Sequence, residues 1–192
     1  MLCTLTYDRV YTTIKPMWGE NEVSNVDREI SCCFTGHRPS KLPWGVNEQD
    51  SRCQKIKQQL RQALERAYTA GYRHFLCGMA RGGDTYFAEA VLELRERCPD
   101  VTLECARPCE TQSHRWPVID QYRYQAILER CNYETLVQHS YTRDCMMRRN
   151  RYMVDHASHM IVIYDGQPKG GTAQTLAYAL RHKLTTDILM IE

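Results

Sequence analysis

The sequence predicts an α/β fold with a doubly wound, mostly parallel sheet and helices on both faces. Short apolar runs alternate with longer segments in which apolar residues recur every three or four positions. Strands that alternate with single helices pair in parallel through right-handed crossovers. Three of the apolar runs end in turns of glycine and polar residues, within Ser31–Pro39, Phe75–Asp84 and Met160–Gly166. Because ligands of such sheets bind at the carboxyl ends of the strands, these turns predict one phosphate-binding pocket.

The expected elements alternate from residue 31 to the end of the chain. Turn residues mark helix ends: Gly71 stops the first helix, Asp84 caps the second, and Pro99 follows it. The run Met160–Tyr164 is apolar almost throughout, as in strands that are covered on both faces. In chain order we expect strand Cys32–Phe34, helix Ile56–Ala67, strand His74–Met79, a helix from Asp84, strand Val101–Ala106, helix Trp116–Cys131, strand Glu134–Gln138, helix Cys145–Ala157, strand Met160–Tyr164, helix Thr172–Lys183 and strand Asp187–Ile191.

One domain accounts for most of the chain. A length of 192 residues is enough for one sizeable core and short for two. Residues 1–30 differ from the rest, because Met1–Ile14 has the pattern of a strand or hairpin, whereas Lys15–Asn25 is polar and contains proline and glycine. We therefore expect an N-terminal extension of uncertain order over residues 1–30 and a single domain over residues 31–192.

Charge and cysteine use narrow the function classes. A formal net charge of +2 gives no electrostatic argument for nucleic acid or a membrane surface, and no apolar stretch approaches the roughly 20 residues of a membrane-spanning helix. Cys32, Cys33 and Cys77 lie in expected buried strands, no signal peptide precedes them, and no pair of cysteines has CxxC spacing. We therefore expect reduced thiols in the core, a cytoplasmic protein and no zinc site.

The loop between the second expected strand and its helix is a candidate phosphate-binding loop. Its glycines let backbone N–H groups approach a phosphate, and the following helix N-terminus favours an anion. The glycine spacing differs from the GxGxxG dinucleotide fingerprint. A tight turn that needs positive φ explains the same glycines equally well. The candidate residues here are Gly78, Met79, Ala80, Gly82, Gly83 and Asp84.

The ends of two other strands add polar groups to the same edge. His37 and Arg38 sit at a strand tip, where such groups indicate a binding site about as strongly as an exposed surface. Trp44 is expected to pack on the domain in preference to covering a base. Thr172 caps a helix or binds a phosphate, and both roles use the same unpaired N–H groups. The candidate residues of these two strand ends are Gly36, His37, Arg38, Asp165, Gly170, Gly171 and Thr172.

A dense basic cluster lies in the expected helix Cys145–Ala157. It contains Arg148, Arg149 and Arg151. A solvated helix face is the simplest interpretation of such a cluster. Because neighbouring residues point about 100° apart around a helix, at most one side of the cluster faces the pocket.

Taken together, the strings CFTGHRP, FLCGMARGGD and GGT and the segment Leu42–Asp50 resemble the YpsA family of the SLOG superfamily of Rossmann-like proteins. The resemblance runs in order from Cys32 to the C-terminus, and residues 1–30 lie outside it. The superfamily also holds the lysine-decarboxylase-like (LOG) nucleotide phosphoribohydrolases, DprA-type single-strand DNA binders and modules that sense ADP-ribose-like nucleotides. The resemblance therefore implies a Rossmann-like fold and a nucleotide-type ligand.

The LOG enzymes allow a comparison of motifs. They carry M-x-x-R-K-x-x-M on a helix and PGGxGTxxE after the next strand, and here Gly171 and Thr172 match the GT pair. The position of the catalytic glutamate falls on Thr175, which cannot act as a carboxylate. Glu48 or Glu89 would have to supply the missing group from elsewhere, so the comparison weakens an enzymatic role. The helix motif falls on Met146, Arg149, Asn150 and Met153.

These arguments lead to a cytoplasmic SLOG-type domain that binds a nucleotide or nucleotide-derived ligand, ADP-ribose-like or another ribose phosphate, as a sensor or regulatory module. The alternatives are a nucleotide N-glycosidase with a non-standard carboxylate and a single-stranded DNA-binding module. We expect no catalytic residue, cofactor or metal and no membrane or nucleic-acid partner, and we leave homo-oligomerisation open. The expected ligand-binding residues are Gly36, His37, Arg38, Gly78, Met79, Ala80, Gly82, Gly83, Asp84, Arg149, Asn150, Asp165, Gly170, Gly171, Thr172 and Thr175.

Overall fold

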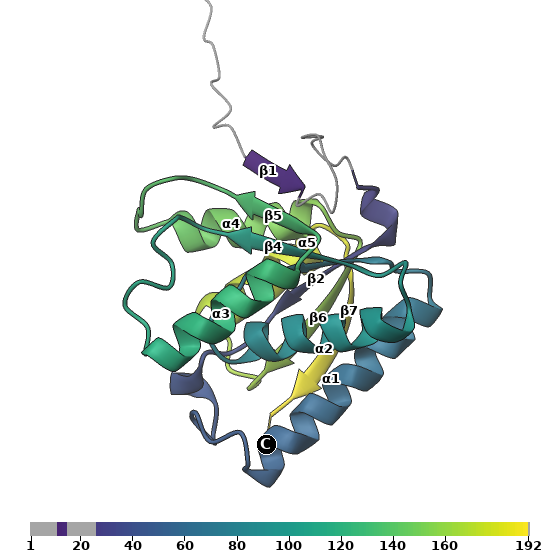
Figure 1. Ribbon diagram of the computed structural model, residues 1–192. Coiled ribbons are helices and arrows are strands. Elements are labelled where there is room, and N and C mark those ends of the chain that lie inside the picture. Colours follow the sequence, from purple (N-terminus) through teal and green to yellow (C-terminus); the bar gives the residue numbers. More distant parts are fainter. Residues whose placement is uncertain (1–10, 15–25, 192) are drawn as a thin grey trace, which may run out of the picture.

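Helices and strands alternate in the order that the sequence predicts (Figure 1). The computed structural model describes residues 11–14 and 26–191. The strands are β1 Tyr11–Ile14, β2 Ser31–Thr35, β3 His74–Cys77, β4 Thr102–Arg107, β5 Tyr133–Leu136, β6 His159–Tyr164 and β7 Thr185–Met190. The helices are α1 Ser51–Thr69, α2 Gly83–Arg97, α3 Val118–Arg130, α4 Cys145–Asp155 and α5 Gly171–Arg181, with 3₁₀ turns η1 Arg28–Ile30 and η2 Pro39–Lys41.

The described residues form a seven-stranded sheet in the order β1-β5-β4-β3-β2-β6-β7. Strands β2 to β7 run parallel, and β1 pairs antiparallel with β5 at one edge. The predicted mostly parallel α/β fold is therefore confirmed. The chain winds outward from β2 through β3, β4 and β5 and then returns to place β6 on the other side of β2. Such a reversal of direction opens a crevice at the carboxyl ends of the neighbouring strands.

Each face of the sheet has its own core. Helices α1, α2 and α3 cover one face, and α4 and α5 cover the other (Figure 1). On the first face Phe34 of β2 stacks on Phe87 of α2, with 4.6 Å between ring centroids. Cys33, the neighbour of Phe34 along β2, belongs to the second core together with Met153. Full burial of a large apolar side chain contributes about 1.5–3 kcal/mol, which explains why the central strands are apolar on both faces.

Glycines set the ends of the first two helices. Gly71, with φ +105°, follows α1 as predicted. The predicted cap of α2 is wrong, because the N-cap is Gly82, with φ +85°. A Cβ at Gly82 would lie 2.8 Å from the carbonyl oxygen of His37, so this position requires glycine. Asp84 instead lies in the first turn of α2, where its carboxylate accepts the N–H of Ala80 at 3.1 Å.

Three further predictions concern the N-terminal strand, the start of α3 and the burial of Trp44. The strand expected within Met1–Ile14 is found at its end, as β1. Residues 1–10 and Lys15–Asn25 lie outside the described residues. Helix α3 begins two residues later than Trp116, because Pro117 takes the N-cap position. Trp44 is 5% exposed and packs in the first core, as predicted.

The described cysteines all carry free thiols, and most of them are buried. Burial raises the pKa of the Cys33 thiol well above its usual range. A thiol that stays protonated packs as a small apolar group, which agrees with the expectation of reduced thiols in the core. Among the helices of residues 26–191, none is both long and apolar enough to cross a bilayer.

Candidate functional site

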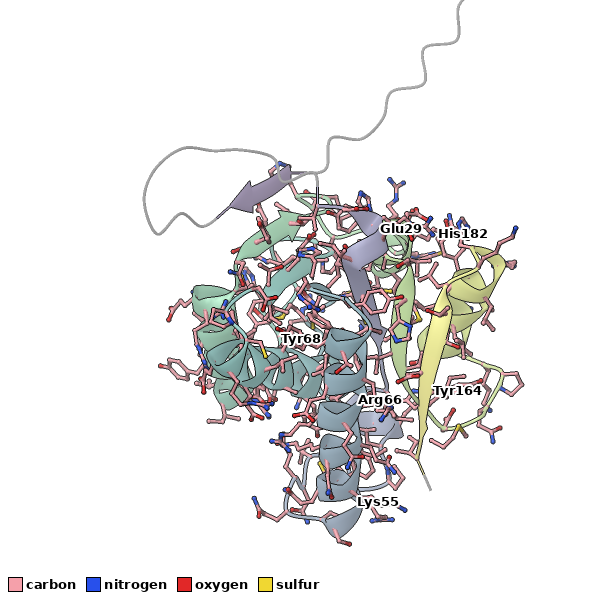
Figure 2. All side chains as sticks on the ribbon, turned by 90° about the vertical axis from the view of Figure 1, so that its right-hand side faces the viewer. Glu29, Lys55, Arg66, Tyr68, Tyr164 and His182 are labelled. Carbon is pink, nitrogen blue, oxygen red and sulfur yellow. The ribbon has the colours of Figure 1, made fainter. Side chains whose placement is uncertain are left out.

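A cavity of about 330 Å³ opens at the carboxyl ends of β2 and β6, where the strand order reverses. Figure 2 shows the corresponding end of the molecule: Tyr164, which ends β6, and Lys55 of α1 lie away from Glu29 and His182. We call this space the Arg149 cavity. Its lining residues are Phe34, Thr35, Gly36, His37, Arg38, Ser40, Lys41, Ala80, Asp84, Met146, Arg149, Asn150, Met153, Gly171 and Thr172.

Two glycine-containing turns press against each other beside the cavity. A Cβ on Gly36 would lie 2.8 Å from the Phe34 ring and 3.3 Å from the Cα of Gly83. The N–H of Gly83 donates to the carbonyl of His37 at 3.0 Å. These glycines therefore allow close backbone packing, which fixes the end of β2 against the N-terminus of α2.

Arg149 reaches the cavity from α4 and is only 3% exposed. Its Nε donates to Oδ1 of Asn150 at 2.8 Å, and its Nη1 lies 3.9 Å from the carboxylate of Asp84. Within residues 11–14 and 26–191, Nη1 has no hydrogen-bond partner. Burial lowers the pKa of Arg149, and the charge of Asp84 offsets this only in part. A buried cation with incomplete pairing favours an anion beside it.

The neighbours of Arg149 on α4 face elsewhere. Arg148 is about half exposed and donates to the carboxylate of Asp144 at 2.7 Å. Arg151 is exposed and lies over the ring of Tyr178, with its guanidinium carbon 5.5 Å from the ring centroid. Helical geometry therefore brings one arginine of the basic cluster into the cavity wall and leaves the other two outside it.

Gly78 leaves the space that the guanidinium of Arg149 occupies. A Cβ on Gly78 would lie 2.1 Å from Nη1 of Arg149. Gln112 holds this loop, because its Nε2 donates to the carbonyls of Gly78 at 3.0 Å and Met79 at 3.1 Å. Gly78 and Met79 thus form the layer behind Arg149 and do not line the cavity themselves.

Asp84 is the carboxylate among the described residues that line the cavity. It is 5% exposed, and burial raises its pKa, while the charge of Arg149 and the N–H of Ala80 partly offset the rise. Glu48 and Glu89, the carboxylates that the sequence offered as replacements, both bind Arg123 and lie outside the cavity lining. Among the described residues, no group of three or more His, Cys, Asp or Glu side chains is arranged to hold a metal ion.

His37 ties the ends of β2, β6 and α5 together. Its Nδ1 lies 3.2 Å from Oγ1 of Thr172, and its Nε2 lies 3.2 Å from the backbone nitrogen of Asp165 and 3.0 Å from its carboxylate. Both ring nitrogens are therefore used within the protein. His37 positions the N-terminus of α5, and Asp165 lies behind it, outside the cavity lining.

The N-terminus of α5 opens onto the cavity. Its N-cap is Gly170, with φ +92° and no side-chain cap, and Gly171 and Thr172 line the cavity. An uncapped helix N-terminus offers unpaired N–H groups to an anion. One turn further on, the hydroxyl of Thr175 donates to the carbonyl of Gly171 at 2.8 Å and accepts from Nδ2 of Asn150 at 2.7 Å. Thr175 thus orients Asn150 and does not line the cavity.

The candidate residues from the sequence divide into a cavity wall and a supporting layer. Gly36, His37, Arg38, Ala80, Asp84, Arg149, Asn150, Gly171 and Thr172 form the wall. Gly78, Met79, Gly82, Gly83, Asp165, Gly170 and Thr175 support it. Sequence reasoning missed Ser40 and Lys41, which η2 brings to the cavity. The available signal was Pro39, whose fixed φ suits a short turn directly after Arg38.

Comparison with known proteins identifies sequence relatives of this chain. The model of the YspA SLOG family (YpsA) matches residues 32–192. The UPF0398 protein YpsA of Bacillus subtilis (strain 168) is 24% identical over 153 residues, which cover 78% of this chain and 84% of the relative. The uncharacterized SPbeta prophage-derived protein YoqJ of the same organism is 28% identical over 138 residues, covering 65% and 80% of the two chains.

Two solved structures share the fold. They are DNA processing protein A (DprA) from Helicobacter pylori, which binds single-stranded DNA, and DprA from Streptococcus pneumoniae, with TM-scores of 0.57 and 0.58. Each is 14% identical to this chain, and the match covers 82% of it. The chain spans 64% and 49% of these two proteins, less than two thirds of either. At this identity the likeness shows the fold alone.

Proposed function

Because the chain belongs to the YspA SLOG family, we propose that it binds a nucleotide or nucleotide-derived ligand in the Arg149 cavity, as a cytoplasmic sensor or regulatory module. The ligand carries a phosphate next to a ribose, as mononucleotides and ADP-ribose do.

The observation that carries the proposal is the guanidinium of Arg149. It is buried, its Nη1 has no hydrogen-bond partner in the described part of the chain, and its ion pair with Asp84 is long at 3.9 Å. Burial of an unsatisfied charged donor is costly. A phosphate oxygen in the cavity would satisfy this donor with a charge-assisted hydrogen bond, so the site is built for an anion.

The surroundings of Arg149 suit the rest of such a ligand. The uncapped N-terminus of α5 adds backbone donors at Gly171 and Thr172, and the exposed Arg38 adds a second guanidinium at the rim. Asp84 offers carboxylate oxygens that accept hydrogen bonds from ribose hydroxyls. The cavity thus offers hydrogen-bond donors to a phosphate and an acceptor for hydroxyl groups. Such a combination suits a ribose phosphate better than an inorganic anion.

We also propose that the chain does not hydrolyse the N-glycosidic bond. That reaction needs a carboxylate to stabilise an oxocarbenium-like centre or to activate water, and a general acid–base group contributes about 10²–10⁴-fold. Thr175 stands where the LOG enzymes that the chain resembles carry it, and its hydroxyl is bonded to Asn150 and Gly171. Chromatography of AMP, CMP and NAD-related nucleotides after long incubation tests this. Sustained release of free base would contradict it and point to Asp84.

Calorimetric titration of AMP and ADP-ribose tests the binding site. Loss of one charged hydrogen bond costs roughly 1.5–3 kcal/mol, so Arg149→Ala should weaken binding by about 10- to 150-fold. Arg148→Ala removes the same charge one residue away from an exposed side chain that binds Asp144, and it should leave affinity within about twofold.

The two variants show whether Arg149, and not Arg148, binds the phosphate. Equal losses in both variants would reject Arg149 as the phosphate ligand, and absence of binding by the unsubstituted protein at millimolar nucleotide would reject the proposed function. Thermal unfolding without ligand checks that Arg149→Ala still folds. Ligand at about 100 times Kd should then stabilise the unsubstituted protein by about 2.7 kcal/mol and the variant by much less.

A further inference from the structure

A second cavity, of about 440 Å³, lies between α4 and α5 and adjoins the Arg149 cavity. The two cavities share Met146, Asn150 and Gly171 as a common wall. Asn150 is held from both sides, because its amide donates to Thr175 and its carbonyl accepts from Arg149. We call the second cavity the arginine groove, and its lining residues are Arg143, Met146, Met147, Asn150, Arg151, Gly171, Gln174, Thr175, Tyr178 and Arg181.

Three arginines line this groove, and none of them is ion-paired within the described residues. Arg143 precedes α4, Arg151 lies on α4 and Arg181 ends α5, so the two helices bring together charges from distant parts of the sequence. Elsewhere on the described surface, exposed arginines of the helices face carboxylates. Examples are Arg61 with Glu93, Arg97 with Glu65 and Arg130 with Glu96.

The nearby acidic groups do not neutralise the groove. Asp144 accepts hydrogen bonds from Thr142 and Arg148, and Asp155 accepts one from the hydroxyl of Tyr178. Neither aspartate lines the groove. Three like charges around one cavity repel each other, and a bound anion relieves that repulsion. The ring of Tyr178 under Arg151 also holds one of the guanidinium groups in place.

We propose that the arginine groove binds the second phosphate of a nucleoside that carries two separate phosphates, while the first phosphate occupies the Arg149 cavity. The inference rests on the proposed function of that cavity and specifies its ligand class. Two anion sites on either side of a shared wall suit phosphates that are attached at different positions of one nucleoside. Met146, which lines both cavities, offers an apolar surface for the nucleoside between them.

The experiment compares AMP with adenosine 3′,5′-bisphosphate by calorimetric titration into the full chain. We expect the bisphosphate to bind about tenfold or more tightly than AMP, the gain typical of one further charge-assisted contact. In the double variant Arg151→Ala with Arg181→Ala, this advantage should disappear while AMP affinity stays within about twofold. The matched control is Arg97→Ala with Arg130→Ala, which removes two exposed arginines from other helices and should preserve the advantage.

Three results would contradict the proposed sites or their ligand. Equal affinity for the two ligands, or an advantage that survives loss of Arg151 and Arg181, would show that the arginine groove does not bind the second phosphate. The proposed binding of a nucleotide in the Arg149 cavity would be unaffected. AMP binding that is insensitive to Arg149→Ala would overturn the proposed function itself. A third arm uses 5′-phosphorylated thymidine oligonucleotides. Affinity that keeps rising with strand length would replace the bisphosphate site with a track for single-stranded DNA.

Discussion

Two clusters of buried charge in this molecule differ in how completely their polar groups are paired. In the first, the carboxylate of Glu104 on β4 lies 2.9 Å from Nε2 of His74. It also accepts hydrogen bonds from the hydroxyls of Thr135 at 2.7 Å and Tyr152 at 2.8 Å. In the second, Nη1 of Arg149 has no hydrogen-bond partner in the described part of the chain, and Asp84 lies 3.9 Å away. Both clusters are almost fully buried.

The pKa shifts express the same difference. Burial by itself raises the pKa of Glu104, but hydrogen bonds from His74, Thr135 and Tyr152 outweigh it, so the net pKa is lowered. Burial also raises the pKa of Asp84, and there the neighbouring charge and N–H do not outweigh it. A satisfied cluster stabilises the fold, whereas an incompletely satisfied one beside a cavity is suited to a ligand.

The largest effect is expected when the satisfied cluster is broken. Glu104→Ala removes the acceptor of three hydrogen bonds and leaves Nε2 of the buried His74 without its carboxylate partner. Removing one member of a buried pair costs about 3–5 kcal/mol of unfolding free energy. The control is Glu65→Ala, which breaks an exposed pair with Arg97 and should cost at most about 1 kcal/mol. Urea denaturation measures both, and similar losses would show that the Glu104 cluster is not a stabilising unit.

A smaller effect is expected when the space behind Arg149 is filled. In Gly78→Ala the new Cβ would lie 2.1 Å from Nη1, so the guanidinium must move from its place at the cavity. We expect nucleotide affinity to fall by about tenfold or more, equivalent to loss of one charged hydrogen bond. Gly71→Ala is the control, because a Cβ there meets nothing within 4 Å and Gly71 lies before β3, outside the lining of the cavity. Any strain at its φ of +105° affects unfolding and leaves the cavity unchanged.

Calorimetric titration of both variants with AMP measures whether the position of the Arg149 guanidinium sets nucleotide affinity. If Gly71→Ala weakens binding as much as Gly78→Ala, the position of the guanidinium is not what sets affinity. Unfolding of Gly78→Ala, measured beside its affinity for AMP, also shows whether the substitution affects binding and stability to different extents. Arg149 is the flexible side chain that must give way, so Gly78→Ala should affect ligand binding more than the midpoint of unfolding.

The fold could be predicted from the sequence because its signals are local. Helical spacing of apolar residues located α1 and α2, and the near-continuous apolar run of β6 indicated a sheet covered on both faces. Errors arose where a local signal has two meanings. Asp84 has the chemistry of an N-cap, but the contact between Gly82 and the carbonyl of His37 decides which residue takes that position. That contact joins two loops and leaves no trace in either one alone.

The candidate site was predictable in part for the same reason. Glycine in a turn indicates either an approach to phosphate or an approach to another backbone, and Gly36 packed against Gly83 shows the second. Helical geometry separates Arg149 from Arg148, but which one is buried depends on the space that Gly78, on another loop, leaves behind Arg149. A net charge of +2 also conceals the arginine groove, because paired surface charges elsewhere cancel in the sum.

The smallest effects are expected in how the stability of the two clusters depends on pH. The folded-state pKa of Glu104 is lowered, so its contribution to stability is present above the unfolded pKa, about 4.3, and is lost as pH falls through the folded pKa. The folded-state pKa of Asp84 is raised, so its contribution is present below the unfolded pKa, about 3.9, and is lost as pH rises through the folded pKa. A tenfold difference in proton affinity between the folded and unfolded states corresponds to about 1.4 kcal/mol of unfolding free energy.

The two carboxylates should therefore give stability differences of opposite slope. Between about pH 3 and pH 6, the unfolding free energy of the unsubstituted protein relative to Glu104→Gln should rise with pH, because the unfolded state binds more protons at this residue. Relative to Asp84→Asn it should fall with pH, because the folded state binds more. Urea denaturation at several pH values without ligand measures both differences. Parallel slopes would mean that the two buried clusters do not differ in the way their hydrogen bonding indicates, and Asp84 would then be a second satisfied carboxylate.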